Sequence, residues 1–416
     1  MLKHFKSAVR SDNVLTAAIF AASGLAFSAS NILFARLLTV DDYAIVALVI
    51  AIIAMSSGIG LFGADGIVNR HDVRPDIRIL VRIFCTSSLT ALASSVAAVG
   101  LYGISVRVAL LMGVAIVAQA AIYFASAYLR SRHEIRSSLF TFNFSNYIFL
   151  VVAIAVGVYG RRGTVVPIAL ITAGLVVCAV WSVGKVSRRY ASVGSSYRYS
   201  WREALVFISL TGSTLVLIQL ERIVTPKLLT LHDLAILGVL LAIVGPPFRL
   251  LQLSLGYALL PKLRQAGSAT EKHSLIVREI AVALALLVPC WILTWYLVPI
   301  LVELFFGAKY ALTGEVILAV IVAGTIKALS GIAASSVTGM GSAKSLEVMA
   351  VAAWIAVAAA VGGAYIGAAF GLAGVVYGVS LGWLVTIVTA WVIVRKHMEG
   401  DREAAAVESA TDPMSP

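Results

Sequence analysis

Three basic side chains lie deep inside long apolar stretches of the sequence: Arg222, Arg249 and Lys327. A charged side chain in the middle of a bilayer costs a few kcal/mol on insertion scales, so such a residue commonly marks a binding site or an ion pathway. Arginine binds phosphate oxygens through two parallel hydrogen bonds, whereas lysine acts as a point charge. We therefore expect these cations to line a cavity that binds an anionic group. For Arg249, extension of the side chain to the lipid headgroups is the open alternative.

Two carboxylates are candidates for coupling or gating. Glu221 directly precedes Arg222, so the two side chains cannot face each other on a helix and each needs another partner. A carboxylate held near lipid can bind and release a proton, which makes Glu221 the coupling candidate. Asp65 stands in Gly63-Ala-Asp-Gly66 near Arg70, where a helix-end ion pair or cap and a gate are both open.

Several amide side chains also fall within apolar stretches. They are Asn143, Asn146, Gln119, Gln219 and Gln252. Amides of this kind hydrogen-bond sugar hydroxyls in a polar cavity, and they equally well join neighbouring helices inside a membrane. Both interpretations stay open for each of them.

The sequence offers no catalytic or metal-binding pattern. Cys85, Cys178 and Cys290 all lie in apolar stretches, without a CxxC pair, so we expect buried free thiols. No nucleophile or paired-carboxylate constellation is present. A GxxxxGK[ST] phosphate-binding loop is also missing, which argues against direct use of ATP. We expect no enzyme activity and no cofactor, with proton or sodium coupling as the energy source.

The composition places these residues in a membrane protein. Of the 416 residues, 60% are hydrophobic and 12% are charged, whereas about a quarter of a typical soluble domain is charged. The net charge of +12 could suggest nucleic acid as a partner. However, the Lys and Arg residues lie between the apolar stretches rather than in one basic face, as in polytopic membrane proteins. We therefore expect no nucleic-acid binding.

A window of about 20 apolar residues, the length that spans a bilayer as a helix, predicts twelve membrane spans. They cover residues 13–35, 43–68, 79–101, 106–128, 138–159, 164–184, 203–226, 234–258, 277–300, 315–339, 345–368 and 371–394. With the N-terminus in the cytoplasm, the inner segments hold 23 Lys and Arg residues and the outer segments hold 6. This asymmetry predicts that both termini are cytoplasmic. In the eighth span, Pro246 and Pro247 indicate a break beside a cavity or a plain kink.

An internal repeat divides the chain into halves. Arg36-Leu-Leu-Thr-Val-Asp-Asp-Tyr-Ala-Ile45 aligns without a gap on Lys227-Leu-Leu-Thr-Leu-His-Asp-Leu-Ala-Ile236. Six spans per half is an even number, so both halves enter the membrane in the same direction. We expect an all-α polytopic protein with two parallel-repeat six-helix lobes, residues 1–190 and 191–398, around a central cavity. The Ala-, Glu- and Ser-rich segment 399–416 is expected to be a disordered cytoplasmic tail.

Several short motifs, in their order and spacing, resemble those of a known transporter group. They are Phe34-Ala-Arg-Leu-Leu-Thr-Val-Asp-Asp-Tyr-Ala44, Leu260-Pro-Lys-Leu263, Leu304-Phe-Phe-Gly-Ala-Lys-Tyr310, Gly339-Met-Gly-Ser-Ala-Lys344 and Gly371-Leu-Ala-Gly374. Together they resemble the polysaccharide flippase branch of the multidrug/oligosaccharidyl-lipid/polysaccharide exporter superfamily over nearly the whole chain. Ala44 departs from the pattern, because glycine is usual there.

The resemblance implies a bacterial inner-membrane flippase. Such a protein moves an undecaprenyl-pyrophosphate-linked oligosaccharide to the outer leaflet by alternating access, for O-antigen or exopolysaccharide synthesis, alongside membrane lipids and other polysaccharide-export machinery. Arg222, Arg249 and Lys327 would then receive the pyrophosphate, and Asn143, Asn146, Gln219 and Gln252 would be candidates for sugar contacts. The alternative is a cation-coupled multidrug exporter of the same fold, a branch that favours acidic residues for cationic drugs.

Overall fold

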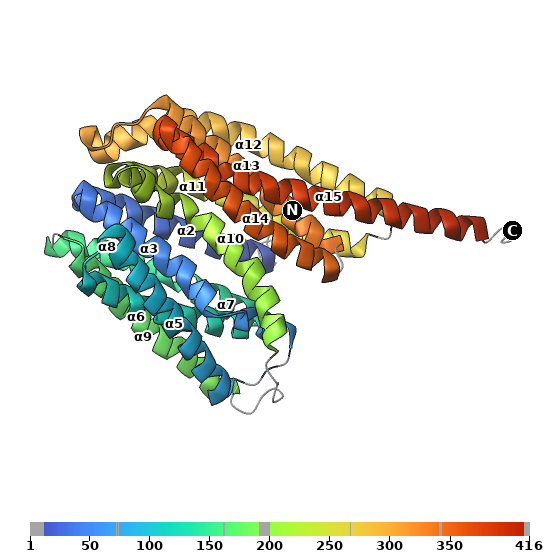
Figure 1. Ribbon diagram of the computed structural model, residues 1–416, viewed down its shortest axis with the longest axis horizontal. Coiled ribbons are helices and arrows are strands. Elements are labelled where there is room, and N and C mark those ends of the chain that lie inside the picture. Colours follow the sequence, from blue (N-terminus) through green and yellow to red (C-terminus); the bar gives the residue numbers. More distant parts are fainter. Residues whose placement is uncertain are drawn as a thin grey trace, which may run out of the picture. The chain divides into compact units, whose positions relative to one another are not determined.

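The computed structural model describes residues 12–71, 73, 75–160, 163–190, 200–266, 268–340 and 343–411, and the regular elements of these residues are all helices (Figure 1). The first ten helices are α2 (Asp12–Leu37), α3 (Val40–Gly60), α4 (Ala64–Arg70), α5 (Ile77–Tyr102), α6 (Val106–Ser131), α7 (Ile135–Phe142), α8 (Phe144–Tyr159), α9 (Val165–Tyr190), α10 (Trp201–Leu228) and α11 (Leu231–Gln265). They are followed by α12 (Ala269–Phe306), η1 (Gly307–Lys309), α13 (Gly314–Met340), α14 (Ala343–Gly367), η2 (Ala368–Phe370) and α15 (Gly371–Thr411).

The described residues contain ten helical ranges that are long and apolar enough to cross a membrane. One of these ranges, Glu347–Gly400, contains both α14 and α15. The helices α7 and α8 meet at a bend of 41° and together pass the same test. If α14 and α15 are counted as two spans, and α7 with α8 as one, the helical ranges correspond to the twelve predicted spans. The chain is therefore an all-α, multi-pass membrane protein.

The second predicted span differs in detail from the helices. It was predicted to run from 43 to 68, but α3 ends at Gly60 and a separate short helix, α4, follows. The chain turns between them through Phe62 and Gly63, which have φ values of 48° and 76°. A side chain at Gly63 would lie 2.5 Å from the carbonyl oxygen of Ala204, so this close approach requires glycine.

The predicted break at Pro246 and Pro247 is wrong, since α11 is continuous from Leu231 to Gln265. Each proline removes only one backbone hydrogen bond, and neighbouring helices in a membrane protein commonly compensate for that loss. A kink, the other interpretation, is compatible with a continuous helix.

The segment from residue 399 was expected to be disordered, but α15 continues to Thr411. Alanine and glutamate are strong helix formers. They also extend a helix that already exists, so the unfavourable nucleation step does not arise. Residues 412–416 of the predicted tail lie outside the described residues.

By internal contacts the chain divides into two compact units. The first comprises Met1–Pro246 and Ile300–Leu312, and the second comprises Pro247–Pro299 and Thr313–Pro416. This division differs from the predicted lobes 1–190 and 191–398, because α10 packs on α3 and α4 within the first unit. Two of the three boundaries fall inside helices, between Pro246 and Pro247 of α11 and after Pro299 of α12, and the third falls just before α13.

The first unit is built around α3 and α6. In α3, 78% of the apolar window is buried inside the protein, whereas α5 buries only 22% of its own. The outer face of α5 carries exposed Leu89, Leu92 and Val96. Apolar residues thus fill the interior and also cover the surface, as expected where lipid replaces water.

The internal repeat corresponds to a shared helix start. Thr39 precedes α3, and its hydroxyl accepts a hydrogen bond of 3.2 Å from the backbone N–H of Asp42. Thr230 precedes α11, and its hydroxyl accepts the equivalent bond of 3.2 Å from the N–H of Asp233. Both pairs are N-caps with an acidic residue in the first turn, which stabilises the positive end of the helix dipole.

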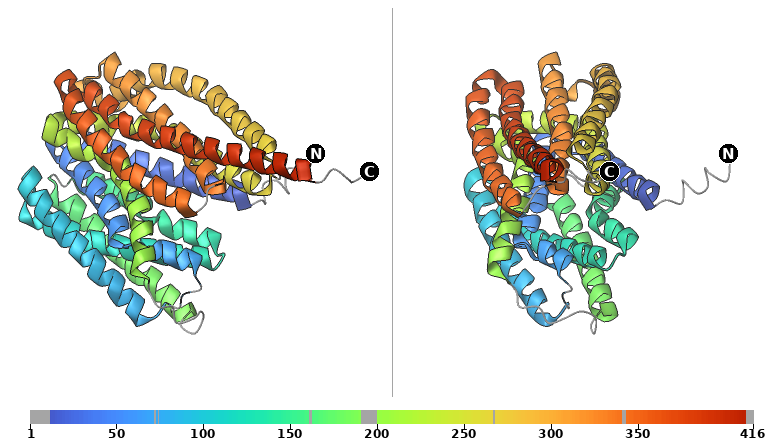
Figure 2. Two further views of the ribbon diagram at one scale, coloured as in Figure 1. Left: turned by 45° about the vertical axis from the view of Figure 1, so that its right-hand side comes forward. Right: turned by 90° about the vertical axis from the view of Figure 1, so that its right-hand side faces the viewer.

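In the second unit, α14 and α15 lie side by side (Figure 2). Gly363 and Gly367 of α14 face Gly378 and Gly374 of α15. A Cβ atom on Gly367 would overlap the carbonyl oxygen of Gly374, and one on Gly378 would overlap that of Gly363. The two backbones therefore pack directly on each other, as small residues permit in membrane helices.

Candidate functional site

Arg222 is a half-buried cation near the C-terminal end of α10, six residues before Leu228 and thus about 9 Å from the helix end. Its Nη1 donates a hydrogen bond of 3.3 Å to Oε1 of Gln219, one turn earlier. Its guanidinium also lies 5.6 Å from the centre of the Phe27 ring on α2. A cation over an aromatic face is attracted by the negative face of the ring. These contacts hold the guanidinium within the first unit.

Tyr43 of α3 belongs to the same region, although nothing in the sequence alone distinguishes it. Its side chain is fully buried and interacts electrostatically with Arg222 and Tyr310. The hydroxyl has no hydrogen-bond partner among the described residues. A Cβ atom on Gly238 of α11 would lie 2.8 Å from this hydroxyl, so only glycine lets α11 pass this close.

Lys309 and Tyr310 both donate to the carboxyl end of α2. Lys309 Nζ lies 2.6 Å from the carbonyl oxygen of Ala35 and 2.5 Å from that of Leu38. The hydroxyl of Tyr310 donates to the Ala35 oxygen over 3.1 Å, and burial raises the pKa of this phenol, which keeps the proton in place. The motif Leu304–Tyr310 thus contacts the motif that begins at Phe34. The sequence does not reveal this contact, since Ala35 and Lys309 are 274 positions apart.

Glu221 is 1% exposed, so it is a deeply buried carboxylate of α10. Its backbone carbonyl accepts a hydrogen bond from the Thr225 hydroxyl within the same helix. The other buried carboxylate of the described residues, Glu279 of α12, lies 3.8 Å from Lys262 Nζ of α11. Glu221 and Arg222 therefore place one acidic and one basic group at the same level of α10.

Arg249 and Lys327 lie at one level of the second unit. Lys327 is midway along α13, about 20 Å from either end. On either side of Lys327, a glycine of α13 lies close to α11. A Cβ on Gly324 would lie 2.8 Å from the Phe248 ring, and a Cβ on Gly331 would lie 2.8 Å from the Gln252 carbonyl oxygen. Lys327 follows Gly324 by three residues and precedes Gly331 by four, so it shares their face toward α11.

Arg249 lies in sequence between Phe248 and Gln252, which approach Gly324 and Gly331 of α13. Arg249 and Lys327 therefore lie at a similar level along two neighbouring helices. Arg249 is exposed at the protein surface, whereas Lys327 is half-buried. Arg222 belongs to the first unit, and a common cavity for all three cations remains a prediction.

The amides differ in their surroundings. Asn143 Oδ1 accepts a hydrogen bond of 2.8 Å from the Ser23 hydroxyl of α2, and Asn146 Nδ2 donates to the same hydroxyl over 2.7 Å. Both thus have the partners expected of interhelical hydrogen bonds. Gln219 contacts Arg222, and Gln252 packs against Gly331. Gln119 is 1% exposed, and its two polar atoms have no hydrogen-bond partner among the described residues.

Asp65 stands in the first turn of α4. Burial raises the pKa of its carboxyl above the ordinary value, although the Gly66 N–H and the positive charge of Arg130 act in the opposite direction. Arg130 also donates through Nε to Oδ1 of Asn69, and Asn69 Nδ2 donates to the Asp65 carbonyl oxygen. These contacts join α4 to the end of α6 and fit the helix-end interpretation of Asp65.

The described residues contain no group of His, Cys, Asp and Glu that could hold a metal ion. The three cysteines are free thiols, with Cys178 buried, Cys290 half-buried and Cys85 exposed. The expectation of three buried cysteines is therefore correct for Cys178 only. Cys85 lies on α5, where the exposed face is also apolar.

Comparison with known proteins gives a likeness of fold without a likeness of sequence. Neither a protein-family profile nor a curated protein sequence matches the chain. Among solved structures, an inward-facing multidrug resistance MATE family transporter of the MOP superfamily aligns with a TM-score of 0.67 and 15% identity, over 93% of this chain and 99% of the transporter. The lipid II flippase MurJ in its inward closed conformation aligns with a TM-score of 0.64 and 14% identity, over 97% and 94%.

A third similar structure is the MATE multidrug transporter DinF-BH, with a TM-score of 0.60 and 13% identity over 93% of this chain and 95% of that one. The three alignments cover almost the whole length of each protein. The chain therefore has the two-lobed membrane fold shared by MATE transporters and MurJ. At these identities the likeness defines the fold, and the cargo has to be inferred from the chain's own residues.

Proposed function

We propose that this protein is a flippase that moves an undecaprenyl-pyrophosphate-linked oligosaccharide across the bacterial inner membrane for polysaccharide synthesis. The observation that carries the proposal is that Arg249 of α11 and Lys327 of α13 lie at a similar level of the second unit, with Arg222 as a further cation within α10 of the first unit. Three membrane-embedded cations suit a cargo whose headgroup is a pyrophosphate.

In the proposed mechanism the two lobes expose the site to each side of the membrane in turn. Arg222 and Arg249 bind phosphate oxygens through their guanidinium groups, and Lys327 adds a point charge. Gln219 and Gln252, each close to one of these cations, donate hydrogen bonds to the first sugar. Asn143 and Asn146 are retained as sugar contacts for a state in which the Ser23 network opens.

Glu221 is the proposed coupling group. A carboxylate that is 1% exposed within a membrane helix can exchange a proton as access alternates. Protonation would neutralise Glu221, so that Arg222 would be the remaining charge of this pair in α10 and would attract an anion more strongly. Sodium would act on the same carboxylate by the same logic, and Asp65 is the gating candidate at the predicted cytoplasmic end.

The alternative, a cation-coupled multidrug exporter, is favoured by Glu221 and by the MATE transporters among the similar structures. Its cargo would be a lipophilic cation. Such a cargo would be repelled by Arg222, Arg249 and Lys327, since like charges in a low-dielectric environment interact strongly. The cations therefore favour the anionic cargo.

The test uses the purified full chain in lipid vesicles that contain a fluorescent undecaprenyl-pyrophosphate oligosaccharide. A membrane-impermeant quencher reports how fast the labelled headgroup reaches the outer leaflet. We expect Arg222→Gln, Arg249→Gln and Lys327→Gln each to slow transfer about tenfold or more, because each removes a charge-assisted hydrogen bond or ion pair. Arg107→Gln, an exposed site before the α6 apolar core, is the matched control and should retain the native rate.

Transfer no faster than in protein-free vesicles would refute the flippase proposal. Native rates in all three Gln variants would refute the pyrophosphate site. Uptake of a lipophilic cationic dye by the same vesicles, driven by a proton or sodium gradient, would establish the multidrug alternative. With a pH gradient imposed, Glu221→Gln should abolish the gradient dependence of transfer, and an unchanged dependence would exclude Glu221 as the coupling group.

A further inference from the structure

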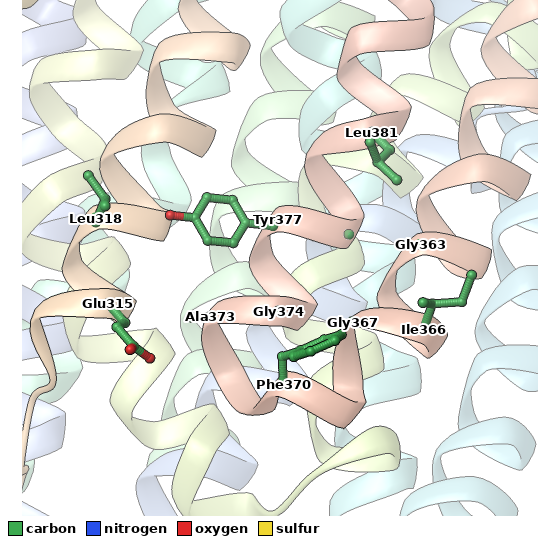
Figure 3. Close-up of a pocket in the computed structure, with 11 residues that line it drawn as sticks. Glu315, Leu318, Gly363, Ile366, Gly367, Phe370, Ala373, Gly374, Tyr377 and Leu381 are labelled. Atoms are coloured by element: carbon green, nitrogen blue, oxygen red, sulfur yellow. The ribbon is translucent and has the colours of Figure 1, made fainter.

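A cavity of about 450 Å³ opens in the second unit beside the turn between α14 and α15 (Figure 3). This volume falls within the range of small-molecule sites. The four glycines of the α14–α15 contact line it together with Ala373, so one side of the cavity consists of backbone and small side chains. Leu318, Ile366, Phe370, Tyr377 and Leu381 supply the larger walls.

The position of the cavity is set by three helix ends. Glu315 is the second residue of α13, while Ile366 and Phe370 flank the end of α14. Membrane helices end near the lipid headgroups, so the cavity lies close to one membrane surface, the predicted outer one. Ile366 and Phe370 are 70% and 77% exposed. Exposed apolar walls at this depth face acyl chains.

Charge distinguishes among the lipids that could occupy the cavity. Glu315 is the one acidic or basic residue that lines it. The Glu315 side chain is exposed and lies below Leu318 on α13, and the Tyr377 hydroxyl is directed toward α13 (Figure 3). An anionic headgroup would be repelled by Glu315, whereas an ammonium group would be attracted. The phenol of Tyr377 can donate a hydrogen bond to a phosphate or ester oxygen.

We propose that this cavity is a binding site for an ammonium-headed glycerolipid, phosphatidylethanolamine. One acyl chain lies in the glycine-lined hollow against Phe370 and Leu381, and the headgroup ammonium pairs with Glu315. The site belongs to the second unit alone, so it does not depend on the cargo proposed above. It holds a structural lipid beside the α14–α15 hairpin.

The test measures lipid retention by the purified full chain. The protein is equilibrated in micelles with equal amounts of phosphatidylethanolamine and phosphatidylglycerol, and native mass spectrometry counts the lipids that stay bound. We expect the native chain to retain phosphatidylethanolamine about three- to fivefold over phosphatidylglycerol, the scale of a solvent-accessible ion pair. Glu315→Gln should bring the ratio close to one. Glu303→Gln, an exposed carboxylate at the end of α12 that does not line the cavity, should leave the ratio unchanged.

A second pair of variants tests the hollow itself. Ala373→Leu fills the cavity and should lower retention of both lipids by at least half. Ala358→Leu, an exposed position on α14 outside the cavity, should not. Thermal unfolding of each variant shows whether it is folded. Equal retention of the two lipids by the native chain, a ratio unaffected by Glu315→Gln, or full retention in folded Ala373→Leu would each overturn the proposal.

Discussion

The ammonium of Lys309 lies 2.6 Å from the carbonyl oxygen of Ala35, which joins the segment after α12 to the end of α2. The same nitrogen reaches the oxygen of Leu38, the residue after α2, so one side chain binds an open carbonyl of the last turn of α2 and the carbonyl that follows the helix. A cation is also favoured there by the helix dipole. Two sequence motifs, the one ending in Lys309-Tyr310 and the one beginning at Phe34, therefore contact each other in the folded protein.

Replacing this lysine tests the strength of the contact. We expect Lys309→Met to lower the free energy of unfolding by about 1.5–3 kcal/mol, because methionine keeps the aliphatic length but loses charge-assisted hydrogen bonds. Lys344→Met, at an exposed position, serves as the control. Denaturant unfolding in detergent gives both values. Equal stability of the two variants would show that the capping contact contributes nothing.

The glycine contact between α14 and α15 predicts a sharp steric difference. Gly378→Ala should destabilise the hairpin by about 1–3 kcal/mol, the usual cost of overpacking, since the new methyl group would overlap the Gly363 carbonyl oxygen. Gly362→Ala has open space around it and should leave the melting temperature unchanged or raise it slightly. Similar melting temperatures for both variants would contradict the close approach.

Asp65 gives a prediction with a definite sign. Because burial raises the pKa of its carboxyl in the folded state, folding favours the protonated form. The stability from this group is fully present below its unfolded pKa and is lost as the pH rises through the folded pKa. We therefore expect Asp65→Asn to melt at a higher temperature than the native chain at neutral pH, with the difference shrinking in acid.

The control for this measurement is Asp41→Asn, which also removes one negative charge but at an exposed position. Melting curves from acidic to neutral pH compare the two variants. If Asp65→Asn is less stable than the native chain at neutral pH, then attraction to Arg130 outweighs burial and the sign is reversed.

Arg249 and Lys327 should act together, since they lie at one level on contacting helices. Residues that share one interaction network commonly show interaction energies of about 0.5–3 kcal/mol in double-mutant cycles. We expect the Arg249→Gln/Lys327→Gln double variant to slow flipping by less than the two single fold-reductions multiplied together. The reason is that the first substitution already disrupts the shared phosphate site. Strictly multiplicative effects would mean that the two cations serve separate sites.

Much of the fold could be predicted from the sequence because a bilayer imposes a strong constraint. Each span needs about 20 apolar residues, so all twelve helical regions were located. The errors arose where local rules compete. Gly63, in the turn between α3 and α4, lies close against Ala204, and a hydropathy average over a window does not contain such a contact. The helix α11 continues through Pro246 and Pro247 because unpaired backbone groups are costly in a membrane, and this outweighs the low helix propensity of proline.

The candidate site was predictable only in part. Arg222, Arg249 and Lys327 could be singled out because charge is rare in apolar stretches, and Arg249 and Lys327 lie at a similar level of neighbouring helices. Tyr43 and Phe27 could not be identified, since a tyrosine or phenylalanine in an apolar stretch is unremarkable until its neighbour is known. The Asn143-Ser23-Asn146 network likewise depends on which helices pack against each other.

The length of α15 has a practical consequence. Its 41 residues make a rod of about 60 Å, roughly twice the hydrocarbon thickness of a bilayer. A helix that crosses the membrane therefore emerges from it as a continuous shaft. A helical fusion partner joined in helical register after Thr411 would continue the direction of α15. Such a fusion would give single-particle imaging a rigid fiducial outside the detergent micelle.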